Sequence, residues 1–337
     1  MGPLISITIT CYNYGKFMNR SLNAIKKQKF KDYEVILVDD KSQDNTVAIV
    51  EDFKRQNPDM NIKLIKNTTN MGVLKARNIA LENSSGKYIM FCDSDDWMDE
   101  NCLEILAQAA IKNDADRVIA QFRDVDQNGK VLQVQKLPKH PSKWICGCHH
   151  GTLYKREIFL KYNIKFKDLY PDDVYINVMF HLHCKRVVFV HKTIYNWYVH
   201  TDSTSRTLNE ASPWIGYKMF EQAASYIMPT IQIICSDIEK QELELQLIKI
   251  YCLAIYHSYR NSSYKELISG YAKINAIMKK YDKNYKKNKF LSIFSESPMR
   301  KYATVIVRTT ILLEKIHMMR VALLGYHILC KFYYFNL

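Results

Sequence analysis

In residues 34–38 the chain reads Glu34-Val-Ile-Leu-Val38, with four consecutive aliphatic side chains directly before Asp39 and Asp40. A strand with apolar side chains on both faces is typical of a parallel sheet that helices cover on both sides. We therefore expect this segment to form an inner strand of such a sheet.

The segments on either side of this strand alternate between two periodicities. Runs of β-branched and other apolar residues predict strands, and apolar residues spaced three or four apart predict helices. The predicted strands are residues 5–10, 34–38, 62–65, 88–91 and 117–121. The predicted helices between them are residues 17–28, 47–53, 74–81 and 103–111. This strict alternation predicts an α/β fold with a doubly wound, mainly parallel sheet.

The chain has 337 residues, which exceeds the usual size of one domain. From about residue 211 onward the apolar spacing is helical and remains so. We therefore expect an α/β domain over residues 1–210 and a basic, helical extension over residues 211–337. With 47% hydrophobic and 24% charged residues, the composition is that of a globular protein rather than a disordered one.

Most of the net charge of +14 lies in the C-terminal region, where residues 240–337 hold 17 Lys and Arg against 6 Asp and Glu. The apolar tail, residues 303–337, is interrupted by charges, which disfavours a membrane-spanning helix. Lysine stems and the aromatic residues Tyr333, Tyr334 and Phe335 favour an element that binds a membrane surface. Two alternatives stay open: a helical bundle packed on the α/β domain, and the interface of a homo-oligomer. We expect no nucleic-acid partner, because no recognition motif accompanies the charge.

Nine cysteines are scattered along the chain, and no charged-then-apolar signal sequence precedes the first strand. An odd number of cysteines in this context predicts reduced thiols and a cytoplasmic location. The segment Cys146-Gly-Cys148-His149-His150 has the ligands of half a zinc site, but the second pair that a closed site needs is not evident.

Carboxylates crowd the position directly after the strand at residues 88–91, where Asp93, Asp95 and Asp96 fall within four positions. Carboxylates this close raise one another's pKa unless a cation neutralises them. Hard oxygen ligands suit Mg²⁺ or Mn²⁺, which also bind the oxygens of a diphosphate. The cluster therefore indicates a divalent-metal site.

The place of this cluster in the predicted sheet decides between two interpretations. In the simpler one, Asp93 and Ser94 merely cap the following helix. In a doubly wound sheet, however, ligands bind beyond the carboxyl ends of the strands, where Asp39 and Asp40 also lie. The sequence contains neither of the glycine-rich motifs that cradle phosphates, so phosphate binding at this edge would rely on the metal.

Four segments in order carry a resemblance to a known family. They are Thr10-Cys-Tyr-Asn13, Val38-Asp-Asp-Lys-Ser-Gln-Asp-Asn-Thr46, Asn70-Met-Gly-Val-Leu-Lys-Ala-Arg-Asn78 and Phe91-Cys-Asp-Ser-Asp-Asp-Trp97. Over roughly residues 4–205 the chain resembles family 2 glycosyltransferases of the GT-A fold. The resemblance implies an inverting enzyme that moves a sugar from a nucleotide sugar, typically a UDP-sugar, to a glycan or lipid-linked acceptor. It also implies a role in bacterial surface-polysaccharide synthesis, at the cytoplasmic face of the membrane.

The resemblance also implies roles for individual residues. Asp40 would bind the base, Tyr12 would stack on it, Asp95 would ligate Mn²⁺ or Mg²⁺, and Arg77 would lie near the diphosphate. The residues implied in nucleotide and donor binding are Thr10, Tyr12, Asn13, Asp40, Arg77, Asp93, Ser94 and Asp96. Taken without the resemblance, Tyr12 is equally a surface aromatic, Asp40 a turn residue before Ser42, and Arg77 an ion-pair partner of Asp93.

Two positions depart from the family pattern. Thr10 stands at or next to a usual proline, and Lys41 stands where the family has glycine. Neither change removes a functional group, but Lys41 is less tolerant than glycine of a tight turn.

A carboxylate must also take the proton of the acceptor hydroxyl. The segment Tyr170-Pro-Asp-Asp-Val-Tyr175 resembles the acidic pair at the start of a family helix, with Asp172 in the acceptor-facing Glu position and Asp173 as the general base. The alternative is a pair of helix-capping residues favoured by the helix dipole.

The segment Tyr195-Asn-Trp-Tyr-Val-His200-Thr-Asp-Ser203-Thr-Ser205 resembles the end of the family's catalytic domain. There His200 would complete the metal sphere, although Tyr198 stands where the family has arginine. Trp144 and His150 lie in a stretch that faces the acceptor in relatives. All three side chains would equally serve as packing residues.

Two other functions are alternatives to the glycosyltransferase. A nucleotidyltransferase of similar fold would need a glycine- and arginine-rich first loop, which residues 10–16 lack. A membrane-associated scaffold without catalysis would not need Asp40, Asp95 and Asp173.

Overall fold

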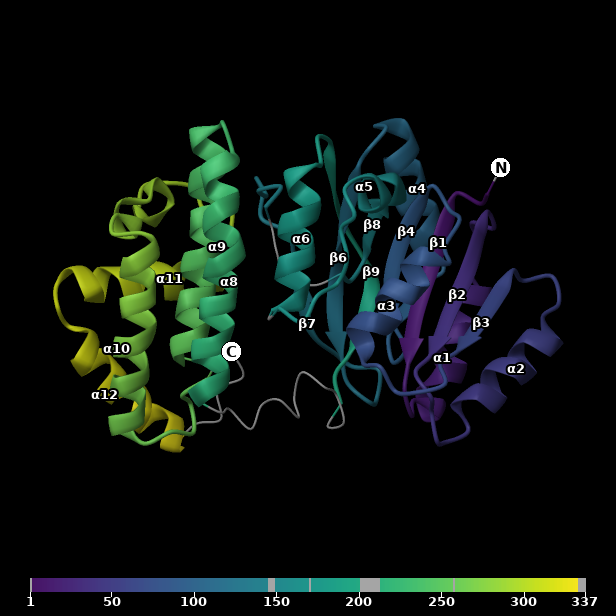
Figure 1. Cartoon of the computed structure of the whole chain (residues 1–337), viewed down its shortest axis with the longest axis horizontal. Helices are drawn as coiled ribbons and strands as arrows, with labels where there is room; N and C mark the ends of the chain where they lie inside the picture. Colours follow the sequence, from purple (N-terminus) through teal and green to yellow (C-terminus); the bar gives the residue numbers. More distant parts are fainter. Residues whose placement is uncertain (1, 145–148, 170, 201–212, 257, 333–337) are drawn as a thin grey trace. The chain divides into compact units, whose positions relative to one another are not determined.

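The structure is a computed structural model that describes residues 2–144, 149–169, 171–200, 213–256 and 258–332 (Figure 1). It divides into two compact units. The first consists of Met1–Leu137, Cys148–Asp168 and Met179–His200, and the second of Pro138–Gly147, Leu169–Val178 and Thr201–Leu337. The predicted domain boundary at residue 210 lies outside the described residues.

A mixed, mostly parallel sheet forms the first unit, which confirms the predicted α/β class. Its strands are β1 (Ile5–Cys11), β2 (Tyr33–Asp39), β3 (Ile62–Lys66), β4 (Tyr88–Asp93), β5 (Trp97–Met98), β6 (Arg117–Val125), β7 (Val131–Gln135), β8 (Thr152–Lys155) and β9 (Val187–Tyr198). Their order is β3-β2-β1-β4-β8-β6-β9-β5, and β7 pairs with the C-terminal part of β6 outside this order. The strands β3, β2, β1 and β4 are parallel neighbours, as the sequence predicts (Figure 1).

The strand at residues 34–38 is buried on both faces, as expected. Val35 and Leu37 belong to the large core that helix α1 (Gly15–Lys26), helix α2 (Thr46–Gln56) and helix α4 (Cys102–Lys112) cover. Ile36 and Val38 face the opposite side, against Ala76 and Ala80 of helix α3 (Val73–Glu82). Successive side chains of a strand point to opposite faces, so an all-aliphatic run satisfies both layers.

The second half of the sheet contains antiparallel strands that the sequence did not predict. β8 lies between β4 and β6 and is antiparallel to both, and β5 pairs antiparallel with β9. The end of β9 is thereby brought beside the loop that follows β4, because Trp97 is paired with Asn196. Two helices, α5 (Arg156–Lys161) and α6 (Asp172–Leu182), connect β8 to β9, and the division between the two units runs through α6.

The second unit is helical, as predicted for the C-terminal region. Its main helices are α8 (Pro213–Ile233), α9 (Asp237–Tyr256), α10 (Tyr264–Tyr281), α11 (Lys301–Lys315) and α12 (Met319–Phe332), with short 3₁₀ turns at Tyr285–Lys287 and Lys289–Leu291. The buried carboxylate of Glu314 accepts hydrogen bonds from the hydroxyls of Tyr251, Tyr271 and Tyr285. Three hydroxyl donors compensate the cost of burying this carboxylate and join α9, α10 and α11.

Lys41 adopts the left-handed backbone conformation, with a φ of 67°. For a residue with a Cβ this conformation costs about 1–2 kcal/mol, whereas glycine costs about 0.5–1 kcal/mol in lost chain entropy. We expect Lys41→Gly to raise the free energy of unfolding by about 0.5–1 kcal/mol, measured by urea denaturation. The control Lys54→Gly, at an exposed position inside α2, should lower it by a similar amount. A loss of stability in both variants would contradict the expectation.

Candidate functional site

Three loops leave the sheet at the same edge, because the strands before them are neighbours in parallel register. Thr10 of β1 lies opposite Val38 of β2 on one side and opposite Asp93 of β4 on the other. The loops that begin at Tyr12, Asp40 and Ser94 therefore start at one level of the sheet. This is the edge at which ligands of doubly wound sheets bind.

Asp40 is buried and organises the neighbouring loop. Its Oδ1 accepts hydrogen bonds from Asn67 Nδ2 at 2.8 Å and from the Met71 amide at 2.9 Å, and its Oδ2 accepts one from the Gly72 amide at 2.7 Å. The alternative role of Asp40, a hydrogen bond that forms the turn before Ser42, belongs to its neighbour. Asp39 Oδ2 accepts the hydrogen bond from the Ser42 amide at 3.0 Å. The base-binding role of Asp40 stays a prediction.

The loop after β1 presents one aromatic ring to solvent. Tyr12 is 42% exposed at the start of this loop. Asn13 adopts a left-handed φ of 57°, and its Oδ1 accepts the Gln43 amide at 2.7 Å. This hydrogen bond joins the loops after β1 and β2. An exposed ring held on a fixed loop is suited to stacking on a nucleobase.

Asp93 contacts a guanidinium and an imidazole. Arg77 Nη2 donates to Asp93 Oδ1 at 3.1 Å, and His150 Nε2 lies 3.4 Å from Asp93 Oδ2. Burial raises the pKa of this carboxyl, but the hydrogen bond from His150 and the charge of Arg77 outweigh it and hold the pKa well below its usual value. Asp93 is therefore a carboxylate. The ion pair between Arg77 and Asp93, which the sequence offered as the alternative role of Arg77, is present.

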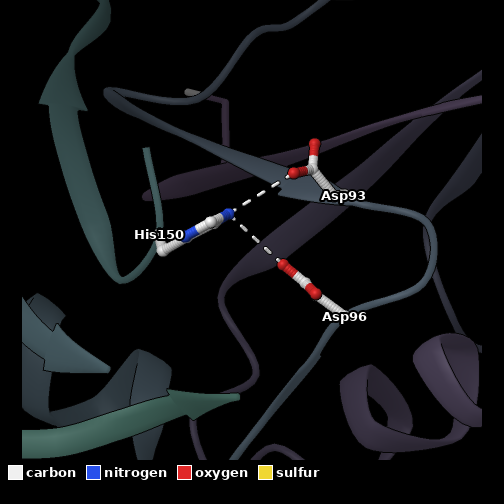
Figure 2. A group of neighbouring side chains, drawn as sticks. All are labelled: Asp93, Asp96 and His150. Atoms are coloured by element: carbon white, nitrogen blue, oxygen red, sulfur yellow. Dashed lines mark hydrogen bonds and ion pairs between the residues drawn. The ribbon is translucent and has the colours of Figure 1, made fainter. Parts of the chain in front are cut away.

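Asp96 has the opposite environment. It is fully buried, and its carboxyl accepts hydrogen bonds from Tyr195 Oη at 2.9 Å and from the Tyr198 amide at 2.8 Å. His150 Nε2 lies 3.5 Å from Asp96 Oδ2, so this imidazole points toward both carboxyls (Figure 2). Burial raises the pKa of Asp96 well above its usual value, and the charge of Asp93 adds to this effect. The neighbouring Ser94 is buried too.

Asp95 is paired with His200. The two predicted metal ligands come together here, with His200 Nε2 2.8 Å from Asp95 Oδ2. The His200 ring also stacks on Tyr198, with centroids 4.8 Å apart and planes inclined by 24°. Burial raises the pKa of Asp95, as does the charge of Asp93, while the hydrogen bond with His200 opposes the shift.

These groups fit a divalent cation by the chemistry of their donors. Ligand atoms of Asp93, Asp96 and His150 lie within 4.8 Å of one another, and Asp95 and His200 form a second carboxylate–imidazole pair. His200 Nδ1 is buried and has no hydrogen-bond partner within the described part of the chain. Carboxylate oxygens and imidazole nitrogens together are ligands that Mn²⁺ accepts.

Three other predicted site residues belong to the second unit. Asp172 and Asp173 are half-buried in the first turn of α6, where the backbone carbonyl of Asp173 accepts the Asn177 amide group at 2.7 Å. Trp144 is 1% exposed. The roles of general base and acceptor contact stay predictions for these residues.

The sequence did not predict that His150 contacts the acidic cluster. The structure places its imidazole against Asp93 and Asp96, and its predicted contact with the acceptor stays a prediction. Its ring is also stacked near Tyr195 and Trp197, at centroid distances of 5.3 and 5.6 Å. The preceding His149 is buried against the Tyr154 hydroxyl at 2.9 Å, and Cys146 and Cys148 lie outside the described residues.

The fold and the carboxylate-lined edge together define an α/β enzyme of the GT-A class. Residues 6–185 match the model of the family described as Glycosyl transferase family 2, and the chain belongs to this family. Among relatives, Escherichia coli WfgD is a UDP-Glc:α-D-GlcNAc-diphosphoundecaprenol β-1,3-glucosyltransferase. It is 33% identical over 176 residues, which cover 51% of this chain and 68% of WfgD.

The fold is found in solved structures of other glycosyltransferases. A crystal structure of Staphylococcus aureus TarS in complex with UDP-GlcNAc has a TM-score of 0.73 and 19% identity, over 97% of this chain and 91% of the TarS chain. The Pyrobaculum calidifontis mannosyltransferase PcManGT, in complex with GDP-Man and Mn²⁺, has a TM-score of 0.58 and 15% identity. This match covers 99% of this chain and 88% of that chain.

Proposed function

We propose that this chain is an inverting, metal-dependent glycosyltransferase that moves a sugar from a UDP-sugar to a hydroxyl of a glycan acceptor. The observation that carries the proposal is the pairing of Asp95, in the loop after β4, with His200, at the edge where Asp40 and Tyr12 also lie. A uracil would stack on Tyr12 and bind Asp40, and the diphosphate would lie between Arg77 and the carboxylates.

Asp95 and His200 would hold Mn²⁺ or Mg²⁺, in the proposed mechanism. When bound, the cation supplies positive charge that stabilises the departing diphosphate. The carboxylate of Asp95 fits this role because His200 engages one of its oxygens. PcManGT, whose structure contains Mn²⁺, supports the choice of ion.

Asp173 would act as the general base. Its carboxylate takes the proton of the acceptor hydroxyl while that oxygen attacks the anomeric carbon opposite the leaving diphosphate, which inverts the configuration. Its place in the first turn of a helix favours the ionised form, because the helix dipole stabilises negative charge there. Asp172 and Trp144 would contact the acceptor.

The acceptor in this proposal is a lipid-linked glycan. The acceptor in the name of WfgD is GlcNAc-diphosphoundecaprenol. The acceptor in the name of Staphylococcus aureus TarS is poly(ribitol phosphate). The first acceptor is a sugar carried by a lipid diphosphate, and the second is a polymer. A polysaccharide precursor at the cytoplasmic face of the membrane is therefore the substrate class that we propose.

The test is a panel of nucleotide sugars with Mn²⁺ or with chelator, scored by the release of nucleotide in the presence of a lipid-linked glycan. We expect one UDP-sugar to support turnover and the chelator to abolish it. Turnover that is equal with chelator would overturn metal dependence. Absence of turnover with every donor would overturn the proposed activity.

The same proposal places the enzyme on a membrane surface through α11 and α12. The exposed apolar residues of these helices include Val305, Leu312, Val321, Leu324, Ile328 and Leu329. Their sequences contain five Lys and Arg, and their single acidic residue, Glu314, is buried. An apolar surface with positive charge is complementary to an anionic bilayer and repels a second copy of itself. Among described residues, no helix has the length and apolar character to cross a bilayer.

Vesicle sedimentation tests this surface. We expect the chain to sediment with vesicles that contain anionic lipid and not with neutral ones, since each basic residue near the surface adds about 1 kcal/mol. The double variant Val321→Asp/Leu324→Asp should lose binding at least about tenfold. Ile111→Asp, at an exposed site on α4, is the control and should bind normally. A stable dimer in solution that the α12 variant abolishes would support the oligomer interface instead.

A further inference from the structure

Arg20 of α1 contacts the acidic loop, which is the segment Asp93–Asp96 at the end of β4. No motif of the sequence pointed to this arginine. Its Nη2 donates a 2.7 Å hydrogen bond to the backbone carbonyl of Asp95. Its guanidinium carbon lies 3.9 Å from the ring centroid of Tyr198 and 4.2 Å from that of Trp97. The two rings are inclined by 56°, so the cation lies in the angle between them. Both distances are within the range of cation–π attraction.

Four contacts join Arg20, Asp95, His200 and Tyr198 in a closed cycle, in which each residue contacts two others. Arg20 binds the Asp95 carbonyl and the Tyr198 ring, Tyr198 stacks on His200, and His200 Nε2 lies 2.8 Å from Asp95 Oδ2. In such a closed cycle, no residue shifts without straining its contacts with both neighbours. The two proposed metal ligands are thereby restrained from opposite directions, one through its backbone and the other through its stacking partner.

We propose that Arg20 is a positioning residue that fixes Asp95 and His200 in the geometry that a divalent cation requires. This inference rests on the proposed function, in which these two residues hold the metal. Arg20 binds the carbonyl oxygen and not the carboxylate of Asp95, so it orients the loop without occupying the ligand atoms. Groups that orient metal ligands in this way are worth about 10–100-fold in metal affinity.

The arrangement needs the planar guanidinium of arginine. A guanidinium stacks on an aromatic face and donates hydrogen bonds in its own plane at the same time, whereas an ammonium is a compact charge on a flexible stem. The family 2 glycosyltransferases that this chain resembles have arginine at the position of Tyr198. In this chain an arginine from helix α1 contacts the Tyr198 ring instead.

Calorimetric titration of Mn²⁺ into the full chain saturated with UDP tests the proposal. We expect Arg20→Ala to raise the Mn²⁺ dissociation constant about 10–100-fold, and Arg20→Lys to raise it less. Lys26→Ala removes a positive charge from the same helix at an exposed position and should bind Mn²⁺ as the wild type does. The melting temperature without metal should stay within about 2 °C of the wild type for all three, because the site is at the edge of the sheet.

A double-mutant cycle removes the dependence on a single variant. Tyr198→Leu breaks the cycle of contacts at another point and should weaken Mn²⁺ binding as Arg20→Ala does, while the double variant should be no weaker than either alone. Normal Mn²⁺ affinity in Arg20→Ala, or additive losses in the double variant, would overturn the proposal. If the wild-type chain itself fails to bind Mn²⁺ in the presence of UDP, the metal-dependent function is wrong and this inference falls with it.

Discussion

Asp95→Asn should lower kcat/KM for sugar transfer by a factor on the order of 10³, because the loss of a metal ligand removes several kcal/mol of transition-state stabilisation. The amide has the shape of the carboxylate and keeps an oxygen facing His200, 2.8 Å away in the wild type, but it lacks the negative charge that a cation needs. The measurement is the initial rate of UDP release across a series of Mn²⁺ concentrations. Higher Mn²⁺ should restore only part of the activity.

An exposed aspartate in the same unit provides the control for this substitution. Asp59→Asn changes the same chemical group in the turn before β3 and should leave kcat/KM unchanged. The contrast separates metal binding from the general loss of one negative charge. Activity of Asp95→Asn at more than about a tenth of the wild-type value, with normal Mn²⁺ dependence, would contradict the role of Asp95.

The first half of the fold was predictable because its strands and helices are long enough to show a period. β1, β2, β3 and β4 begin and end within two residues of the predicted segments. Their apolar runs reflect burial on two faces, which is a local property of the sequence. The requirement that both faces of these strands be apolar is therefore visible in the sequence of each strand by itself.

The antiparallel half of the sheet was not predictable in the same way. β5 has two residues and β8 has four, which is too few to display an alternation. β7 is an exposed edge strand next to β6, so little burial constrains its sequence. These strands exist because partners distant in the chain offer them hydrogen bonds, and no local pattern records such partners.

The residues of the site also separate into those that local sequence predicts and those that depend on tertiary structure. Asp40, Asp93 and Asp95 were predicted because they directly follow strands, and parallel register brings the ends of those strands together. The contact of His150 with Asp93 and that of Arg20 with Asp95 were not predicted, since the partners lie 57 and 75 positions apart in the chain. These contacts depend on how β8 and α1 pack, which tertiary structure alone determines.

Asp173→Asn should lower kcat by about 10²–10⁴-fold while leaving the affinity for the UDP-sugar within about twofold. The asparagine side chain has nearly the same size but does not accept the proton of the acceptor hydroxyl at neutral pH. The backbone carbonyl of residue 173 would still accept the hydrogen bond from Asn177, so α6 should keep its first turn. The measurements are single-turnover transfer with saturating acceptor, and calorimetric binding of the UDP-sugar.

The neighbouring carboxylate distinguishes proton transfer from acceptor binding. Asp172 lies in the same first turn, but in the proposed mechanism it contacts the acceptor and takes no proton. Asp172→Asn should therefore raise the KM for the acceptor and change kcat less than about tenfold, whereas Asp173→Asn should lower kcat at every acceptor concentration. A helix-capping pair would produce another pattern, since both substitutions would then lower the melting temperature and neither would affect the chemical step. Equal, purely structural effects of the two variants would thus remove Asp173 from the reaction and leave the base to be sought elsewhere in the chain.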